Sequence, residues 1–129
     1  MICNNILEAL GHTPLVRLRK MVSGDMADVL VKFEALNVGG SIKTRTAANM
    51  IAVAEAQGLL KSDSVIVEPT SGNQGIGLSL VAAVKGYKVV IVMPDSVSEE
   101  RRKLMKHYGA EVILVHDDGN IGKAMEDCV

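Results

Sequence analysis

The sequence is poor in aromatic side chains and in cysteine, and both shortages exclude classes of function. It has no Trp, two Tyr and one Phe in 129 residues, so it lacks the stacking platforms on which single-stranded nucleic acids are bound. Cys3 and Cys128 are far apart and fit no metal-ligand spacing, which indicates reduced thiols in a cytoplasmic protein. His12, His107 and His116 also lack such spacing, and we expect no metal site.

An excess of one charge and long apolar runs are missing too. The formal net charge is −1 and like charges form no run, so we expect no face for nucleic acid. Apolar runs are broken by Gly, Lys or Pro before they reach the length of a membrane span, and the first residues show no export signal. With 48% hydrophobic and 22% charged residues, the chain is predicted to fold as one globular domain, residues 1–129.

What is present is an alternation of strand and helix patterns. β-branched runs bounded by Gly or Pro predict strands, and apolar residues at helical spacing predict helices. The alternation is typical of an α/β fold with an open, mostly parallel sheet flanked by helices. The predicted strands are 15–18, 29–33, 65–67, 89–93 and 111–115, and the predicted helices are 4–10, 41–57, 76–84, a segment from Ser96 or Ser98 to His107, and a last helix from 121.

The chain is organised around residues 68–77, which read EPTSGNQGIG. A loop rich in Gly and hydroxyl groups joins a strand to a helix here, so free N–H groups and the positive end of the helix dipole would face an anion. Thr70, Ser71 and Asn73 add side-chain donors. The glycines are spaced G-x-x-G-x-G rather than G-x-G-x-x-G. The pattern alone therefore leaves three interpretations open: a phosphate site, a dinucleotide site (which Asp95 after the next strand would support) and an ordinary tight turn.

A second motif, residues 37–45, reads NVGGSIKTR and leads into the helix predicted from Ser41. Lys43 lies in the first turn of that helix, where the dipole favours anions over cations. The plain interpretation is a solvated surface lysine. The alternative is a lysine that carries a carbonyl cofactor as a Schiff base, because positive surroundings and burial lower the pKa of an amine and make it nucleophilic.

Together, the two motifs resemble the pyridoxal-phosphate enzymes of the cysteine synthase (O-acetylserine sulfhydrylase) and cystathionine β-synthase family. The resemblance covers essentially this whole chain, in order and with spacing intact, but less than half of the family's usual length. It implies the N-terminal domain of fold-type II enzymes, with pyridoxal 5′-phosphate as the cofactor. Further landmarks that agree are residues 11–18, 93–94, 98–102 and 108–112.

The resemblance also implies roles for individual residues. Lys43 is similar to the Schiff-base lysine, which also carries the proton at the substrate α-carbon. Asn73 is similar to the residue that hydrogen-bonds the 3′-oxygen of the cofactor. Residues 93–102 would belong to the part that closes over substrate. The loop that grips the substrate α-carboxylate would consist of Thr70, Ser71, Gly72, Asn73 and Gln74.

The implied reaction is β-replacement: an activated serine such as O-acetylserine loses its leaving group, and sulfide or another nucleophile adds. The cofactor would act as the electron sink. Val38 and Thr44 depart from the family's usual Pro and Asp, which leaves the exact substrate open. Two alternatives remain, a non-catalytic amino-acid-binding or regulatory fragment and a dinucleotide-binding α/β module.

Two parts of the family's site have no counterpart in this sequence. Its Gly/Thr-rich phosphate loop and the Ser or Thr that faces the pyridine nitrogen lie in a second domain. The strands within residues 1–34 are expected to pair with the sheet of that domain, while residues 35–129 carry the lysine and carboxylate motifs. We therefore expect an incomplete N-terminal portion that is inactive alone, from an enzyme that forms a homodimer when complete.

Overall fold

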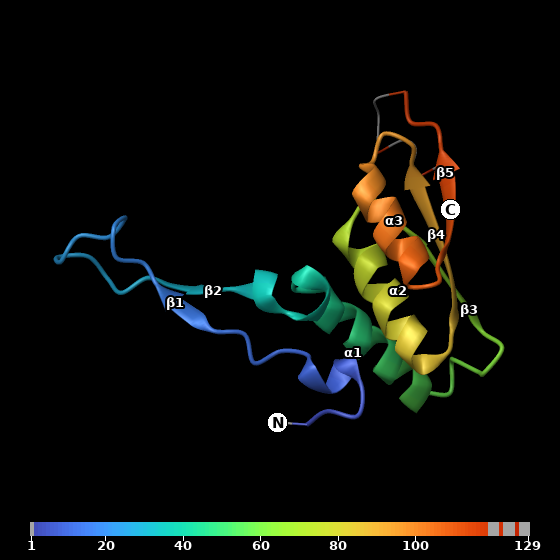
Figure 1. The fold of residues 1–129 in the computed structure, drawn as a ribbon, viewed down its shortest axis with the longest axis horizontal. Helices are drawn as coiled ribbons and strands as arrows, with labels where there is room; N and C mark the ends of the chain where they lie inside the picture. The colour runs from blue at the N-terminus through green and yellow to red at the C-terminus, as the bar shows by residue number, and fades with distance from the viewer. Residues whose placement is uncertain (1, 119–121, 123–125, 127–129) are drawn as a thin grey trace.

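The computed structural model describes residues 2–118, 122 and 126. In that part, three parallel strands form one sheet in the order β3-β4-β5, and a separate hairpin pairs β1 with β2. Figure 1 shows α1, α2 and α3 on the same side of the three-stranded sheet. The elements are η1 (Ile6–Ala9), β1 (Leu15–Arg17), β2 (Leu30–Lys32), η2 (Glu34–Leu36), η3 (Val38–Gly40), α1 (Lys43–Ala56), β3 (Val65–Pro69), α2 (Asn73–Lys85), β4 (Lys88–Pro94), α3 (Glu99–His107) and β5 (Glu111–Val115).

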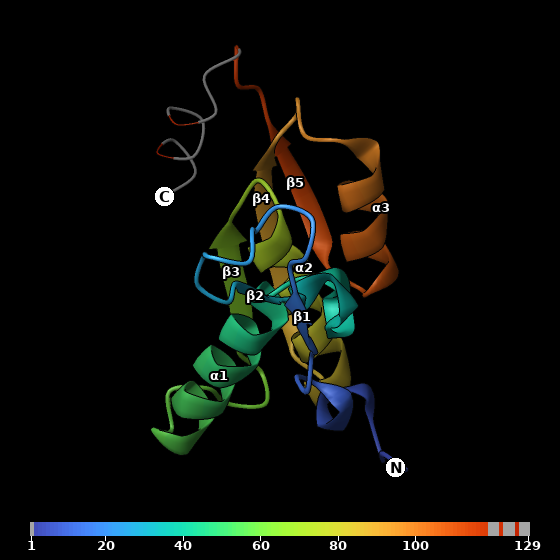
Figure 2. The same cartoon turned by 90° about the vertical axis from the view of Figure 1, so that its left-hand side faces the viewer.

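The core lies between β4 and the helices. Val89, Ile91 and Met93 alternate along β4 and are buried, because a strand directs every second side chain to the same face. The helix α2 is buried from Gly75 to Ala82, since it lies between α1 and α3 and packs on the sheet (Figure 2). A helix in that position is apolar almost all round, as the sequence of α2 is. Among the described residues, no helix is both long and apolar enough to span a bilayer.

This arrangement places the loop of residues 70–72 at the carboxyl edge of the sheet. The loop follows the end of β3 at Pro69 and precedes the start of α2 at Asn73. Thr70 N continues the ladder by donating to Val92 O at 2.9 Å, so the loop is fixed to the last residues of β4. In open α/β sheets, ligands bind at this edge.

The hairpin of β1 and β2 buries no core in the described chain. Its strands are antiparallel, with Leu15 opposite Lys32 and Arg17 opposite Leu30. Every residue of both strands is exposed, including Leu15 at 60%. Figure 1 shows the hairpin extending away from the helices. The open, mostly parallel sheet predicted from the sequence is thus confirmed for β3 to β5, and the two N-terminal strands lie outside it.

Several element boundaries agree with the sequence prediction and others differ. The strand β5 has the predicted bounds, and α1 ends before Gly58, whose φ is +70°. The helix predicted over 4–10 is a single 3-10 turn, η1. The helix α2 begins at Asn73, three residues before the predicted 76. Gly75 lies inside its first turn and packs closely, since a Cβ there would lie 2.6 Å from Thr70 Cγ2.

The start of α3 settles the choice between two serines. The helix begins at Glu99 directly after Ser98, whose side chain makes no capping hydrogen bond to it. The start at Ser96 is wrong, because the Ser96 hydroxyl instead donates to Asp117 in the segment after β5. The last predicted helix, from 121, lies outside the described residues.

Candidate active site

The chain enters α1 through a tight loop of glycines. The segment between β2 and α1 holds two short 3-10 turns, η2 and η3. Gly39 and Gly40 have φ values of +79° and +73°, which glycine adopts without strain. Ser41 Oγ then accepts from Lys43 N at 3.2 Å, which satisfies one of the free N–H groups at the helix start. The glycine loop therefore ends by fixing the backbone of Lys43.

The side chain of Lys43 is available to a ligand. It is exposed, the first turn of α1 contains no acidic residue, and no described residue pairs with its Nζ. The described residues do not bury this amine, although the Schiff-base interpretation of the sequence invoked burial. The amine thus stands at the positive end of a helix dipole without a counter-charge of its own.

A helix crossing brings Lys43 toward the central loop. At the crossing, α2 has a glycine, Gly77, and a Cβ there would lie 2.9 Å from Lys43 O and 3.1 Å from Thr44 N. Asn73 lies four residues before Gly77 and hence on the same face of α2, one turn nearer its N-terminus. The structure therefore brings together the first turns of the two helices that carry the predicted lysine and the predicted asparagine.

The central loop presents free donors at the start of α2. The cap residue, Gly72, has no side chain that could accept a hydrogen bond from the helix start. Within the described ranges, the N–H groups of Asn73, Gln74 and Gly75 have no acceptor. The first turn contains no acidic residue. Thr70 is buried, and its Oγ1 accepts from Gly72 N at 3.2 Å, which leaves its O–H to donate. The geometry can hold an anion such as a carboxylate.

The Gln74 side chain is directed elsewhere. Its Nε2 lies 3.6 Å from Met50 Sδ, so the amide packs on α1. Next to Met50, a cavity of about 190 Å³ between α1 and β3 is lined mainly by apolar side chains and by Glu68. Burial raises the pKa of Glu68. Gln74 therefore presents its backbone N–H, and not its side chain, at the start of α2.

A cluster of polar groups ties the N-terminal segment to α1. Arg45 donates to both carboxylate oxygens of Glu34 at 2.9 Å, and the Thr13 hydroxyl donates to Glu34 as well. The guanidinium of Arg45 and the hydroxyl of Thr13 lower the pKa of Glu34 to about 2. Buried Asn37 accepts from Gly11 N and Val38 N and donates to Glu34. We call Thr13, Glu34, Asn37 and Arg45 the N-terminal clasp.

The sequence interpretation missed the clasp and also a contact from α3. Arg101 Nη1 donates to Ser71 O at 2.9 Å, in the middle of the central loop. The sequence placed Arg101 only as a family landmark. No local signal could identify this contact, because the two residues are thirty positions apart and meet only through packing of α3 beside α2.

Asp95, the residue that would support the dinucleotide interpretation, has a histidine as its partner in the structure. Its Oδ2 lies 2.7 Å from His116 Nδ1, and His116 Nε2 lies 2.8 Å from Asp118 Oδ1. These two carboxylates raise the pKa of His116. The carboxylate on which the dinucleotide interpretation rested is therefore engaged by a histidine that follows the neighbouring strand.

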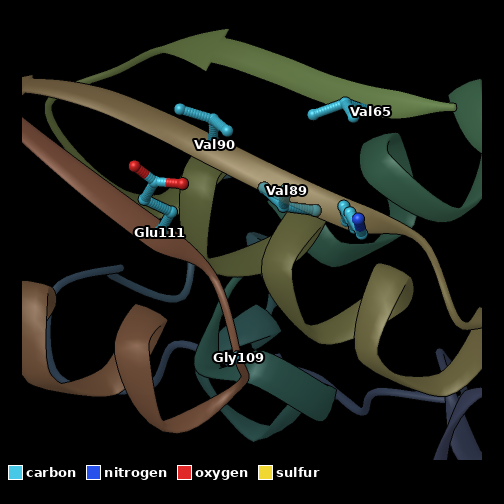
Figure 3. A pocket seen from close by; sticks show the side chains of 6 residues that line it. Val65, Val89, Val90, Gly109 and Glu111 are labelled. Atoms are coloured by element: carbon cyan, nitrogen blue, oxygen red, sulfur yellow. The ribbon is translucent and has the colours of Figure 1, made fainter.

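A second cavity, of about 290 Å³, lies at the opposite edge of the sheet (Figure 3). It is bordered by the first residues of β3, β4 and β5, namely Val65, Lys88 and Glu111, together with Val90 and Gly109. The central loop lies at the carboxyl ends of these strands. This cavity is therefore remote from the candidate site.

Comparison with known proteins identifies the class. Residues 6–129 match the family model described as pyridoxal-phosphate dependent enzyme, and the chain belongs to that family. A cysteine synthase from Flavobacterium sp. is 53% identical over 122 residues, an alignment that covers 95% of this chain and 39% of the relative.

Two solved structures agree with the fold. A cysteine synthase from Entamoeba histolytica has a TM-score of 0.88 and 40% identity, covering 98% of this chain and 39% of that chain. An O-ureido-L-serine synthase has a TM-score of 0.88 and 44% identity, covering 99% and 40%. The expected fold-type II architecture is thus confirmed. The chain spans 39–40% of the length of these three proteins.

Proposed function

We propose that this chain supplies the lysine-bearing and carboxylate-binding part of an enzyme that carries out β-replacement on an activated serine, as a cysteine synthase does. The observation that carries the proposal is the crossing of α1 and α2. There the backbone of Lys43 lies against Gly77, and Asn73 is one turn before Gly77 on the same face of α2. The names of the relatives support the same class of amino-acid chemistry.

The described residues fit the aldehyde end of pyridoxal phosphate. A primary amine that no described group pairs, Lys43 Nζ, lies on the same crossing as the exposed amide of Asn73. The bound cofactor would supply an electron sink for the charge that develops at the substrate α-carbon. Lys43 would hold its aldehyde carbon, and Asn73 would donate a hydrogen bond to its 3′-oxygen.

The chain's own residues would then position substrate and move one proton. The Ser71 hydroxyl and the free N–H groups of α2 would hold the α-carboxylate, because charge-assisted hydrogen bonds from a helix N-terminus favour anions. Once the substrate amine has displaced Lys43 from the aldehyde carbon, the freed amine of Lys43 would take the proton from the α-carbon and the leaving group would depart from the β-carbon. Lys43 would return the proton after a nucleophile such as sulfide has added to the β-carbon.

The phosphate of the cofactor needs a further site, which we place in a second domain. The exposed apolar hairpin of β1 and β2 supports this, since it is the part of residues 1–34 that we expect to pair with that domain's sheet.

A homodimer in the cytoplasm is proposed on the family resemblance and on the sparse cysteines. Light scattering of the protein expressed from its own gene measures the oligomeric state.

Reduction with borohydride tests the function. The protein expressed from its own gene is mixed with pyridoxal phosphate, reduced and mapped by peptide mass spectrometry. We expect a pyridoxyl group on Lys43, and we expect Lys43→Ala to lose both the label and β-replacement. A label on Lys32 or on Lys85, which pairs with Glu55 at 2.5 Å, would overturn the assignment. No label, with NAD or free amino acid bound instead, would favour the dinucleotide or the non-catalytic alternative.

A further inference from the structure

Three basic residues near the start of α3 have different partners. Lys103 pairs with Glu99 on the same helix, 3.0 Å away. Arg102 donates to the carbonyls of Val97 and Asp95, in the segment just before the helix. Arg101 alone of these three reaches across to another element, donating from Nη1 to Ser71 O.

The contact of Arg101 fixes one peptide plane in the central loop. In a trans peptide the carbonyl and the following N–H point in opposite directions. The carbonyl of Ser71 accepts from Arg101 at 2.9 Å, and the N–H of Gly72 donates to Thr70 Oγ1 at 3.2 Å. Both ends of the plane are therefore held, and Gly72 is the residue that caps α2.

Gly72 provides the space for this contact. A Cβ at position 72 would lie 3.2 Å from Arg101 Nη1, closer than most side-chain contacts allow. The guanidinium therefore lies directly against the backbone of the loop. Within the described ranges Arg101 has no carboxylate partner, so its positive charge near the start of α2 is not neutralised by an ion pair.

We propose that Arg101 is a positioning residue for the carboxylate loop: through the Ser71 carbonyl it orients the donors of Ser71 and α2 toward the substrate α-carboxylate. The inference rests on the proposed function of that loop. Arg101 acts on the loop and not on the reacting atoms, so its loss weakens binding of the amino acid and leaves the cofactor in place.

The test compares a probe that has the carboxylate with one that lacks it. The protein expressed from its own gene is loaded with pyridoxal phosphate and titrated with L-serine or with ethanolamine, its analogue without the carboxylate, while cofactor absorption is followed. We expect Arg101→Gln to raise the Kd for L-serine about three- to tenfold, the size of a charge-assisted hydrogen bond near solvent. The Kd for ethanolamine, the starting spectrum and the melting temperature should stay unchanged.

The matched control is Lys103→Gln, which removes one positive charge two residues along the same helix from a side chain that pairs with Glu99. We expect it to bind L-serine as the unaltered protein does, and Arg101→Lys to recover part of the affinity. Equal Kd values for Arg101→Gln and Lys103→Gln, or equal weakening of both probes, would overturn the inference. Failure of the unaltered protein to respond to either probe, with no label on Lys43, would instead count against the proposed function.

Discussion

Gly77 lies directly against the backbone of Lys43. A Cβ at position 77 would lie 2.9 Å from the carbonyl oxygen and 3.0 Å from the carbonyl carbon of Lys43. Backbone atoms cannot move aside as the end of a flexible side chain can. The glycine therefore sets how closely the first turn of α1 approaches α2, and through this approach it sets the position of the lysine.

Gly77→Ala should lower stability and displace Lys43. Overpacking costs about 1–3 kcal/mol, which exceeds the roughly 0.5–1 kcal/mol that alanine gains over glycine inside a helix. Urea unfolding should show the loss, and labelling of Lys43 by pyridoxal phosphate and borohydride should fall. Gly24→Ala is the control, since nothing lies within 4 Å of a Cβ there. Equal stability of the two variants would contradict the close contact.

Thr44→Val should stabilise the chain. Thr44 is fully buried, and its Oγ1 has no hydrogen-bond partner among the described residues. A buried hydroxyl without a partner costs free energy, so replacing it by a methyl group of the same shape should raise the free energy of unfolding by about 1 kcal/mol. Thr46→Val, at an exposed position of the same helix, should change it little. A loss of stability in Thr44→Val alone would mean that the hydroxyl has a partner.

The N-terminal clasp should make stability depend on pH in the acid range. The pKa of Glu34 falls from 4.5 to about 2 in the folded chain. A carboxyl group with a lowered folded pKa stabilises the fold above its unfolded pKa and loses that contribution as pH falls. The loss should therefore occur between about pH 4.5 and pH 2.

Glu34→Gln isolates this contribution. Urea unfolding of both proteins at pH 7 and near pH 3 should show a smaller pH dependence in the variant, which lacks the titrating group. Glu99→Gln removes a carboxylate whose ion pair with Lys103 is largely exposed, and it should keep the dependence of the unaltered chain. The same dependence in all three proteins would remove the clasp as its source.

Ser71 and Asn73 should give different responses to substitution. If Ser71 holds the carboxylate, Ser71→Ala should leave the spectrum of the bound cofactor unchanged and weaken L-serine binding about tenfold or more. Asn73→Ala should shift that spectrum and its pH dependence before any amino acid is added. Titration of both variants with and without L-serine decides between these outcomes. One shared response, or a loss of stability alone, would indicate an ordinary tight turn.

The parts of the fold that local sequence could predict are those set by short-range rules. Strand β5 follows from a β-branched run between Gly109 and a polar turn, and the end of α1 follows from Gly58 at positive φ. The start of α2 was predicted too late, because its first turn belongs to the glycine-rich stretch that was interpreted as a loop, and the packing of Gly75 on Thr70 appears only in the fold.

The same distinction applies to the candidate site: contiguous motifs could be recognised in the sequence, whereas contacts between distant residues could not. The Gly-rich loop and Lys43 were found because they form contiguous motifs. The contact of Arg101 with Ser71 and the bonds of Arg45 to Glu34 join residues far apart in the chain, and only tertiary packing creates them. The Ser96 start was wrong for the same reason, since Asp117 competes for its hydroxyl.

The hairpin of β1 and β2 has a consequence for handling the protein. In the described chain this sheet consists of two strands, so each strand keeps one edge whose N–H and C=O groups are open to another strand. Beside these edges stand Val16, Leu30 and Val31, each 40–47% exposed. Open edges with apolar side chains are templates for added strands. A preparation of these 129 residues alone should therefore self-associate as concentration rises, through β-strand addition at the hairpin.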